Sequence, residues 1–571
     1  MSSASAMRPP EIPFRISDEE CLTKVTMFFI INKDNDGRRR HFRKNGHEAG
    51  HGSLGGLAWS NDGGCLLRQT PCDGAGLTGR RNPSRRDAPA ECDDRRAPLE
   101  KYPVAQSIRR RRWAWDIHPV RLPAAACGLA GMAAMNKAVV ADEARLAKAL
   151  LVNLLELGGL SAALAGRATF VGAGDIYPTP FRLGATMAAA VAAIRLAADS
   201  LEGRTLPFAV DLAVAAASTS SFRYVRLNGA PTASPRDVLT GFYAAADGQP
   251  VFLHLNFPHH RARAFATLGL RDPDRAAIGR AVAVWPSDQL DERLNAAGAC
   301  ATITRDRMAW RASSSFAALS SRPLVTIDKI ADSEPHSRKS RALAELRVVD
   351  FTRVLAGPTC GRVLAEGGAS VLRVNNPRLG DLPAYELDAN RLKRQVTLDL
   401  DAPADREQLL ADIEVADVFL QAYRPGAVAR YGLSAEALAL RRRGLIYVSL
   451  SAYGEADGRR GFDSVLQAAA GLALEQGQGV PALLPTSPID YLSGFLLAYG
   501  ALVALGRRAR EGGSYVVRTS LAQVAEWLAA LPPTPRALDE MPSNAFIDGL
   551  MQQTTTAAGI VEHLRSPITS L

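Results

Sequence analysis

The chain has 571 residues, of which 47% are hydrophobic, and this is typical of a globular protein with roughly three or four domains. Its net charge of +10 suits ligands that bear phosphate groups, nucleic acid or acidic surfaces. Roughly seven of these positive charges fall in the first ~130 residues, and the rest of the chain is only slightly basic. The charge distribution therefore argues against a dedicated nucleic-acid-binding protein.

The cysteines number seven, most of them lie near the N-terminus, and none forms a Cys-x-x-Cys pair. This usage predicts neither a disulfide framework nor a metal site and is typical of a reducing cytoplasm. No apolar run reaches the ~18 residues that cross a bilayer. The first residues also lack the basic start and apolar block of a signal peptide. We therefore expect a cytoplasmic protein that does not bind a membrane.

Residues 1–134 differ in composition from the rest of the chain. They contain blocks of arginine, such as Arg109 to Arg112, and show neither a period of 2 nor one of 3.6. Such a composition cannot bury enough apolar surface to offset the entropy of ordering, and it predicts a disordered basic extension. A patch that binds RNA or a membrane is the alternative. A further hypothesis is that this segment lies upstream of the true coding start, at Met132 or Met135.

Residues 135–330 show an ordered pattern. Helices are predicted at 146–164 and 181–198, and a strand at 207–212. Two apolar runs within Thr240 to Leu255 meet at Asp247-Gly248, which predicts a β-hairpin. Residues 331–342 are polar, carry Pro335 and are expected to form a linker.

An internal repeat links this region to the second half of the chain. Phe181 to Leu212 and Leu484 to Leu521 share a long apolar helix, a Glu-Gly pair, a strand and a leucine. Aligning Gly184 with Gly494 places Pro180 opposite Asp490, so the first copy lacks this acid. Chance similarity between two helices rich in Ala and Leu is the alternative explanation.

Strands and helices alternate from 343 to 530, which is the rhythm of a doubly wound α/β domain. The predicted strands are 346–351, 369–374, 395–400, 417–420, 445–450 and 515–521, and the predicted helices are 358–366, 404–413, 434–441 and 492–510. Asp490 precedes the last of these helices, where a helix N-cap is its simplest role. Residues 531–571 are expected to be a weakly patterned tail.

The loop from Arg353 to Pro358 joins the first strand of this domain to its first helix. Open α/β sheets bind ligands beyond the carboxyl ends of their strands. The Gly-x-Gly-x-x-Gly pattern of dinucleotide-binding loops is absent from it. Basic residues lie in or near later loops, at Lys393-Arg394, Arg424, Arg430 and Arg459-Arg460. Each alone is an ordinary surface charge, but together they suit a polyphosphate ligand.

Six motifs follow one another between Leu343 and Trp527: VVDFTRVLAGPTCGRVLAEGGASVLRV, KRQVTLDL, ADVFLQAYRPGAVARYGL, LIYVSLSAYG, RRGFDSVLQAAAGLA and PIDYLSGFLLAYGALVAL. This ordered set resembles the family III CoA-transferases, the group that includes formyl-CoA and carnitine CoA-transferases and α-methylacyl-CoA racemase. Residues 136–326 resemble the family more weakly, and TGFYAAADGQPVFLHL is similar to a small-domain segment that normally follows the catalytic half. The order is therefore either permuted or that of two fused and trimmed copies.

The resemblance implies a doubly wound, Rossmann-like CoA-binding domain with a smaller α+β domain. It also implies site residues. Asp490 matches the nucleophilic aspartate of the family. The positions that match CoA-contacting segments are Leu355, Ala356, Lys393, Ala422, Tyr423, Arg424, Arg430 and Arg460. Ala422 stands where Asn is usual, Asn375-Asn376 replace Glu-Arg, and the family's Gly-rich loop is not recognisable.

The resemblance further implies transfer of coenzyme A from an acyl-CoA to a small carboxylic acid through an aspartyl anhydride and an aspartyl-CoA thioester. Such an enzyme needs no permanently bound cofactor, and family members form interlocked homodimers. A racemase on the same fold is one alternative, but Phe462 occupies the position of the racemase histidine, and no histidine lies between Leu343 and His563. A non-catalytic CoA-binding protein is the other alternative.

Overall fold

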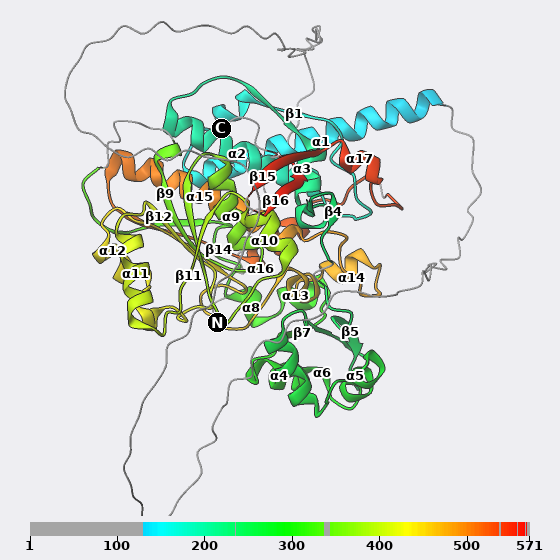
Figure 1. The fold of residues 1–571 in the computed structure, drawn as a ribbon. Helices are drawn as coiled ribbons and strands as arrows, with labels where there is room; N and C mark the ends of the chain where they lie inside the picture. The colour runs from blue at the N-terminus through cyan, green and yellow to red at the C-terminus, as the bar shows by residue number, and fades with distance from the viewer. Residues whose placement is uncertain are drawn as a thin grey trace, which may run out of the picture. The chain divides into compact units, whose positions relative to one another are not determined.

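The computed structural model describes residues 129–233, 236–335, 343–535, 538–556, 558–565 and 567, with side chains from residue 141 onward. The predicted extension 1–134 therefore lies outside the described residues as far as residue 128. Its last residues belong to the first helix, α1 (Leu129–Gly158). Within the described part, Figure 1 shows helices on both faces of one large sheet.

The large sheet has seven strands in the order β11-β10-β9-β12-β13-β14-β8. Its parallel strands are β9 (Arg347–Phe351), β10 (Ser370–Asn375), β11 (Arg394–Thr397), β12 (Val418–Gln421), β13 (Ile446–Ser451) and β14 (Ser514–Ser520). Numbered along the chain, these six strands lie in the order 3-2-1-4-5-6 of a doubly wound, Rossmann-type sheet. The predicted α/β class is therefore confirmed.

Alternate residues of each strand enter two different cores, because successive side chains point to opposite faces of a sheet. Val348 packs on one side with α9 (Ala356–Glu366) and α15 (Pro488–Glu511). Val349 packs on the other side, against α11 (Pro403–Glu414) and α12 (Ala435–Arg441). Burial on both faces explains why these strands are continuously apolar in sequence.

The predicted repeat appears in the structure as a repeated order of elements. Helix α2 (Leu183–Glu202) ends at Gly203 and leads into β2 (Phe208–Asp211) and α3 (Leu212–Ser218), as α15 ends at Gly512 and leads into β14 and α16 (Leu521–Ala529). β2 pairs in parallel with β1 (Ala168–Val171), as β14 pairs in parallel with β13. Helices α2 and α15 pack against each other. This correspondence favours two fused, trimmed copies over a permuted single copy.

A smaller α+β unit has the strand order β5-β6-β7, formed by β5 (Gly241–Ala244), β6 (Pro250–Leu253) and β7 (Ala301–Ile303). The first two strands form the predicted hairpin. Figure 1 shows its helices gathered around these strands: α4 (Pro258–Leu268), α5 (Arg275–Val282) and α6 (Ser287–Ala296). Its strands contact α13 (Asp463–Ala469), which connects this unit to the large sheet.

Two predicted boundaries differ from the structure. The edge strand β8 (Thr326–Ala331) precedes the expected linker but pairs antiparallel with β14, so the chain does not change body at residues 331–342. The expected tail 531–571 contains β15 (Met551–Thr556) and β16 (Gly559–Leu564), which join β3 (Arg226–Leu227) and β4 (Ala230–Pro231) in one sheet. The strands that pair with β16 lie more than 300 residues away along the chain. The local sequence of 531–571 therefore did not indicate that these residues form strands.

Other helices connect these units: α7 (Arg307–Arg311), α8 (Ser314–Ala317), α10 (Pro383–Asn390), α14 (Leu472–Gln476) and α17 (Asn544–Asp548). Two of the long helices, α2 and α15, are long and apolar enough to cross a membrane by length and composition. The expectation that no stretch would meet this criterion is therefore wrong. Each has 94% of its apolar window buried within the protein, so packing inside the chain accounts for the apolar residues.

Candidate active site

Asp490 lies in the first turn of α15, which begins at Pro488 after Ser487. It is thus inside the helix, and the expected role of N-cap does not apply. Proline at the first helical position starts the helix earlier than the apolar pattern suggests, because it has no N–H to leave unpaired. The side chain is 6% exposed and stands at the positive end of the helix dipole.

A second carboxylate, Asp463, anchors the backbone at this point. Its Oδ2 accepts a hydrogen bond from the Asp490 backbone N at 3.0 Å, and its Oδ1 accepts one from Gln467. The Gln467 Oε1 in turn accepts a bond from the Leu484 backbone N at 2.8 Å. Helix α13 therefore holds both the approach to α15 and its first turn in place.

The two carboxyl groups influence each other's ionisation. Burial raises the pKa of Asp490 well above its usual range, and the charge of Asp463 raises it further. Burial also raises the pKa of Asp463 to about 6, against the hydrogen bonds that it accepts. No cation among the described residues forms an ion pair with the Asp490 carboxylate. A buried carboxylate without a countercharge is a reactive nucleophile once it is ionised.

Asp490 faces two cavities. The first, which we call the sheet-edge cavity, has a volume of about 350 Å³ and lies where the loops after β9, β12 and β13 meet. The residues predicted to contact CoA that line it are Leu355, Ala356, Ala422, Tyr423, Arg424 and Arg460. The structure therefore brings together six of the eight predicted positions and places them beside Asp490, at the carboxyl ends of the strands as expected for a doubly wound sheet.

The sheet-edge cavity is strongly basic. Burial lowers the pKa of Arg460, and the charges of Arg424 and Arg263 lower it further, so these three guanidinium groups lie close together. A more open hollow of about 680 Å³ shares all three arginines. Clustered arginines that repel one another are stabilised by an anion between them, as a phosphate group would be.

The two remaining predicted contacts, Lys393 and Arg430, do not line the cavity. The buried Lys393 Nζ lies 2.7 Å from Asp350 Oδ2 and also donates to the Pro358 carbonyl and to Asn390 Oδ1. All three of its donors are thereby used in joining β9, α9 and α10. Arg430 has 71% of its side chain exposed and lies over the Tyr431 ring. Their assignment as CoA contacts stays a prediction.

Val354 contributes to both cavities with an unusual backbone. Its φ of 68° is in the left-handed region, which is strained for a β-branched residue. A hydrogen bond of 3.1 Å from its backbone N to Asp381 Oδ2 helps to hold this conformation. The loop that follows β9 is therefore fixed in a shape that local sequence preference does not favour.

The second cavity, which we call the Arg223 cavity, has a volume of about 360 Å³ and lies between the two halves of the chain. The second half contributes Asp463, Asp490 and Tyr385 to its lining, and the first half contributes Arg223 and Arg236. The residues around these five are Phe222, Thr232, Ala233, His254, Asn256, Phe257, Val354, Phe462, Ser464 and Ser487. The earlier copy thus supplies one wall of the site.

Sequence reasoning missed this wall. A buried network attaches it to α15: the Tyr491 hydroxyl donates to Asp388 Oδ2 at 2.7 Å and accepts a bond from the Phe222 backbone N at 2.8 Å. Arg362 lies 3.0 Å from the other oxygen of Asp388, and Ser221 also donates to that oxygen. The resemblance of Thr240 to Leu255 to a family small domain was the available signal, but it gave no contact with Asp490.

A histidine also reaches the site from the first half. His254 stacks on Phe462, with 4.3 Å between ring centroids and 14° between ring planes. Phe462 is the residue that replaces the racemase histidine, so the structure brings an imidazole beside a position where the sequence has none. Burial lowers the pKa of His254 to about 3, and this ring is therefore neutral at physiological pH.

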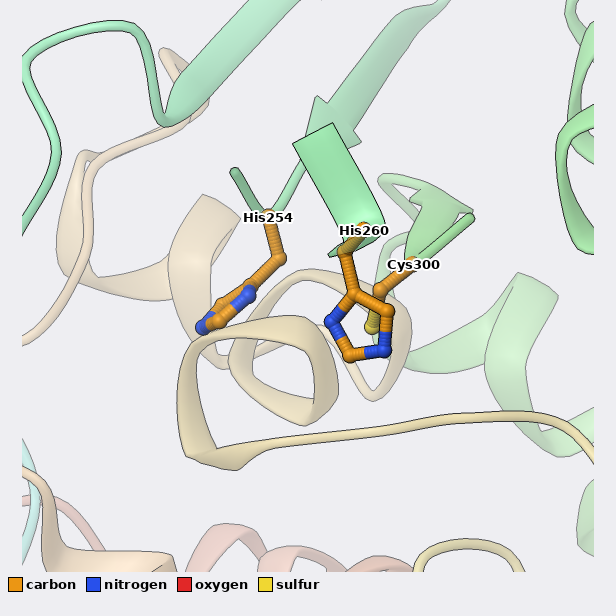
Figure 2. Close-up of side chains that lie close together, drawn as sticks. All are labelled: His254, His260 and Cys300. Carbon is orange, nitrogen blue, oxygen red and sulfur yellow. The ribbon is translucent and has the colours of Figure 1, made fainter. Parts of the chain in front are cut away.

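His254, His260 and Cys300 form a buried group whose possible ligand atoms lie within 4.8 Å of one another, and Figure 2 shows the three side chains close together. Burial raises the pKa of Cys300 to about 12, which disfavours the thiolate that a metal would need. Burial lowers the pKa of His260, as do the neighbouring His259 and His254, and the charges of Arg460 and Arg263 lower it further and would also repel a cation. We assign the cluster to packing against Phe462.

Residues 343–546 match the family model described as CoA-transferase family III. An acyl-CoA transferase of Gibberella moniliformis is 34% identical over 313 residues, which are 49% of this chain and 55% of that protein. A probable fatty acyl-CoA transferase of Mycobacterium tuberculosis is 36% identical over 215 residues, which are 34% of this chain and 54% of that protein. The chain thus spans about half the length of these relatives.

A formyl-CoA:oxalate CoA-transferase of Afipia carboxidovorans is 32% identical over 189 residues, which are 30% of this chain and 45% of that protein. The crystal structure of a CaiB/BaiF family protein from Brucella suis aligns at 25% identity with a TM-score of 0.29, over 38% of this chain and 64% of that one. The family match includes Asp490, Asp463 and the loops after β9, β12 and β13. The part of the chain from 343 to 546 is therefore similar to CoA-transferase family III.

Proposed function

We propose that this protein transfers coenzyme A from an acyl-CoA to a carboxylic acid, with Asp490 as the nucleophile. The observation that carries the proposal is the position of Asp490 at the junction of two cavities. The basic sheet-edge cavity suits the phosphate groups of CoA, and the Arg223 cavity leaves room for the acyl group. A carboxylate between the two is placed to exchange bonds with both.

The reaction takes four balanced steps. The Asp490 carboxylate attacks the thioester carbonyl, and the carbon–sulfur bond breaks to release CoA thiolate and form a mixed anhydride. The thiolate attacks the aspartyl carbonyl of the anhydride, which expels the donor acid as a carboxylate and leaves an aspartyl-CoA thioester. The acceptor carboxylate then attacks that thioester and expels the thiolate, forming a second anhydride. Thiolate attack on the acceptor carbonyl restores the Asp490 carboxylate.

The first turn of α15 supports these steps. The positive end of the helix dipole lies at Asp490 and stabilises the negative charge that develops on oxygen in each attack. Asp463 is a positioning residue, because its carboxylate accepts the Asp490 backbone N–H and so holds the first turn of α15 in place. The chemistry proposed here requires no permanently bound cofactor.

The test is to incubate the protein with a panel of acyl-CoAs and to weigh it intact. We expect a mass increase that corresponds to a CoA thioester, and hydroxylamine should convert it to a hydroxamate on the peptide that contains Asp490. A protein that binds CoA but gains no mass with any acyl-CoA would be the non-catalytic binder instead.

Racemisation is the second candidate, because His254 lies beside Phe462. Proton exchange at an α-carbon needs groups that accept and return a proton. A histidine with a pKa of about 3 is a weak base, so we favour transfer. The test is to incubate a 2-methylacyl-CoA with the protein in D₂O, without an acceptor acid, and to follow deuterium at the α-carbon by NMR. Exchange that is lost when His254 is replaced would favour the racemase.

We further propose that the protein acts in the cytoplasm as a homodimer that does not bind nucleic acid or a membrane. Basic residues suited to a phosphate ligand gather around the two cavities, which supports a small-molecule substrate. Both walls of the Arg223 cavity come from one chain, so each subunit is expected to hold its own site. Light scattering that finds only a stable, active monomer would refute dimerisation and leave the transfer reaction standing.

A further inference from the structure

Three of the described residues line both the sheet-edge cavity and the Arg223 cavity: Val354, Phe462 and Asp490. Bonds are exchanged where the two cavities meet in the proposed reaction, so the placement of these residues affects its rate. Asp463 holds Asp490 through the backbone N, and His254 stacks on Phe462. Val354 needs a contact of another kind, because its backbone has a conformation that a β-branched side chain disfavours.

The conformation of Val354 sets the direction of the chain between β9 and α9. Its φ of 68° lies in a region that β-branched residues rarely occupy and that persists only where surrounding contacts hold it. Leu355 follows directly, and α9 begins at Ala356. Relaxation of Val354 to an ordinary φ would therefore change the path of Leu355 and the position of the first turn of α9.

The start of α9 lies directly against the face of α15 that carries Asp490. Gly494 stands four residues after Asp490, which places the two on one side of the helix. A Cβ atom on Gly494 would lie 2.6 Å from the Ala356 carbonyl oxygen, so the two backbones meet without space for a side chain. A shift of the chain at Val354 would therefore alter the contact between α9 and the first turns of α15.

The side chain of Asp381 holds Val354 in its left-handed conformation. Asp381 lies in the loop before α10, and its side chain is 2% exposed. Its Oδ2 accepts the Val354 backbone N–H at 3.1 Å and a bond from Arg373 at 2.8 Å. Its Oδ1 accepts a bond from Arg353 at 3.2 Å. The two guanidinium groups fix the orientation of the carboxylate, and the carboxylate fixes Val354.

We propose that Asp381 is a positioning residue for the transfer reaction. By holding Val354 in its left-handed conformation, it sets the start of α9 beside Asp490. The inference rests on the proposed transfer reaction and adds a residue that lines neither cavity. Its effect falls on the chemical step and not on CoA binding, because the arginines that suit the phosphate groups lie in the loops after β12 and β13.

The experiment is a double-mutant cycle between Asp381→Ala and Val354→Gly. Glycine adopts a positive φ about as readily as a negative one, so it needs no partner to hold it there. The readout is the rate constant for formation of the CoA adduct, measured by intact mass at saturating donor. The donor is whichever of acetyl-CoA, propionyl-CoA and butyryl-CoA reacts fastest with the unaltered protein.

Asp381→Ala should lower this rate constant at least about 10-fold, since small displacements of reacting groups have effects of this size or larger. The Kd for CoA, measured by calorimetry, should change less than about 3-fold, because only the chemical step is affected. In the Val354→Gly background, Asp381→Ala should lower the rate constant less than about 3-fold, because glycine removes the need for the contact.

Two further variants separate this role from that of a countercharge. Asp381→Asn keeps an oxygen for the Val354 N–H but removes the charge, and it should retain the rate constant within about 3-fold. Asp417→Ala is the matched control, because Asp417 accepts the Arg347 backbone N–H at 3.0 Å and pairs with the buried Arg508 at 3.0 Å. Asp417 directly precedes β12 and lines neither cavity. Its loss should lower stability and leave the rate constant per folded molecule unchanged in both backgrounds.

A loss in Asp381→Ala that Val354→Gly removes, and that Asp381→Asn does not show, supports the proposal. An equal loss in both backgrounds, an equal loss in Asp381→Asn, or no loss at all overturns it and leaves the transfer reaction standing. If Asp381→Ala alone does not fold, the double variant decides: folded and active protein supports the proposal, and unfolded protein overturns it. If the unaltered protein forms no adduct, the transfer reaction fails, and the proposal fails with it.

Discussion

The N-terminal ends of α15 and α2 correspond in the repeated order of elements, and each lies beside a buried acid in an opposite situation: Asp490 is part of α15, whereas Glu143 of α1 contacts the start of α2. At α15, Asp490 faces two cavities and has no ion-pair partner among the described residues. At α2, the buried Glu143 pairs with Arg182 at 2.9 Å and accepts a bond from the Ala185 backbone N at 2.9 Å. One helix end thus leaves a buried carboxylate without a countercharge, whereas the other pairs a buried carboxylate with an arginine.

The neighbours of each helix explain the difference. Arg182 also pairs with Asp142 at 2.8 Å and donates to the Pro532 carbonyl at 3.2 Å, so the α2 end is closed by chain from both halves of the protein. Burial still raises the pKa of Glu143 to about 7 despite this cation. The α15 end instead meets the Arg223 cavity, and no cation among the described residues forms an ion pair with Asp490 there. A helix end that faces a cavity and has no countercharge suits catalysis. A helix end that is covered by other segments and carries a paired charge suits a role in stabilising the fold.

The largest expected effect comes from Asp490→Asn, which removes the nucleophile and keeps its shape. Transfer should fall by at least about 10³-fold, since loss of a covalent nucleophile removes the whole pathway. CoA binding, measured by calorimetry, should remain. Glu143→Gln is the matched control at the other helix end and should keep its activity. Equal loss of activity in both variants would contradict the difference between the two ends.

Arg182→Met tests the neutralised end. Removing the cation leaves Glu143 buried and unpaired, which should lower the free energy of unfolding by about 3 kcal/mol. The penalty should be larger at pH 8 than at pH 5, because Glu143 takes up a proton at the lower pH. Denaturant unfolding at both pH values checks this, with transfer activity per folded molecule as the second readout. A penalty that does not depend on pH would show that the pair contributes through packing alone.

Arg460→Gln and Arg430→Gln compare an arginine inside the sheet-edge cavity with one outside it. The first should raise the KM for acyl-CoA by about 10-fold, the effect of one charge-assisted hydrogen bond. The second should change KM less than about 2-fold, because Arg430 is 71% exposed at a site remote from the cavity lining. Steady-state kinetics at fixed ionic strength gives both values. A larger increase in KM for Arg430→Gln than for Arg460→Gln would indicate that Arg430 contacts CoA.

The pH dependence of thermal stability tests the ionisation of Asp490 at the start of α15. The pKa of Asp490 is raised in the folded protein, so its contribution to stability is fully present below its unfolded pKa and is lost as pH rises through the folded pKa. Asp490→Asn should therefore melt at a higher temperature than the unaltered protein at pH 8, by a few degrees, and at the same temperature near pH 4. Calorimetry gives both values. A constant difference across this range would mean that Asp490 is not protonated in the folded state.

The smallest expected effect is that of removing residues 1–134. A chain that begins at Met135 keeps Asp142, Glu143 and the part of α1 that packs on α2. We expect soluble protein with unchanged CoA binding and transfer. Static light scattering and the adduct assay measure both properties, and loss of folded protein would show that this segment contributes to the core.

The amino-acid sequence by itself determined the doubly wound sheet, because apolar strands that are buried on both faces leave a strong local pattern. Motifs that are contiguous in the chain also predicted Asp490 and six positions that the structure places around one cavity beside it. The start of α15 was misjudged, because Pro488 places the first turn ahead of the apolar run.

Only the tertiary structure decided what surrounds Asp490. Lys393 reads as a ligand contact in sequence, but it is buried with all of its donors used by Asp350, Pro358 and Asn390. No motif in the sequence singles out Arg223 or Arg236, but they line the cavity that Asp490 faces. Such roles depend on contacts between segments more than 200 residues apart, such as Phe222 with Tyr491. The local sequence pattern does not predict these contacts, because packing energy depends on which surfaces meet in the folded chain.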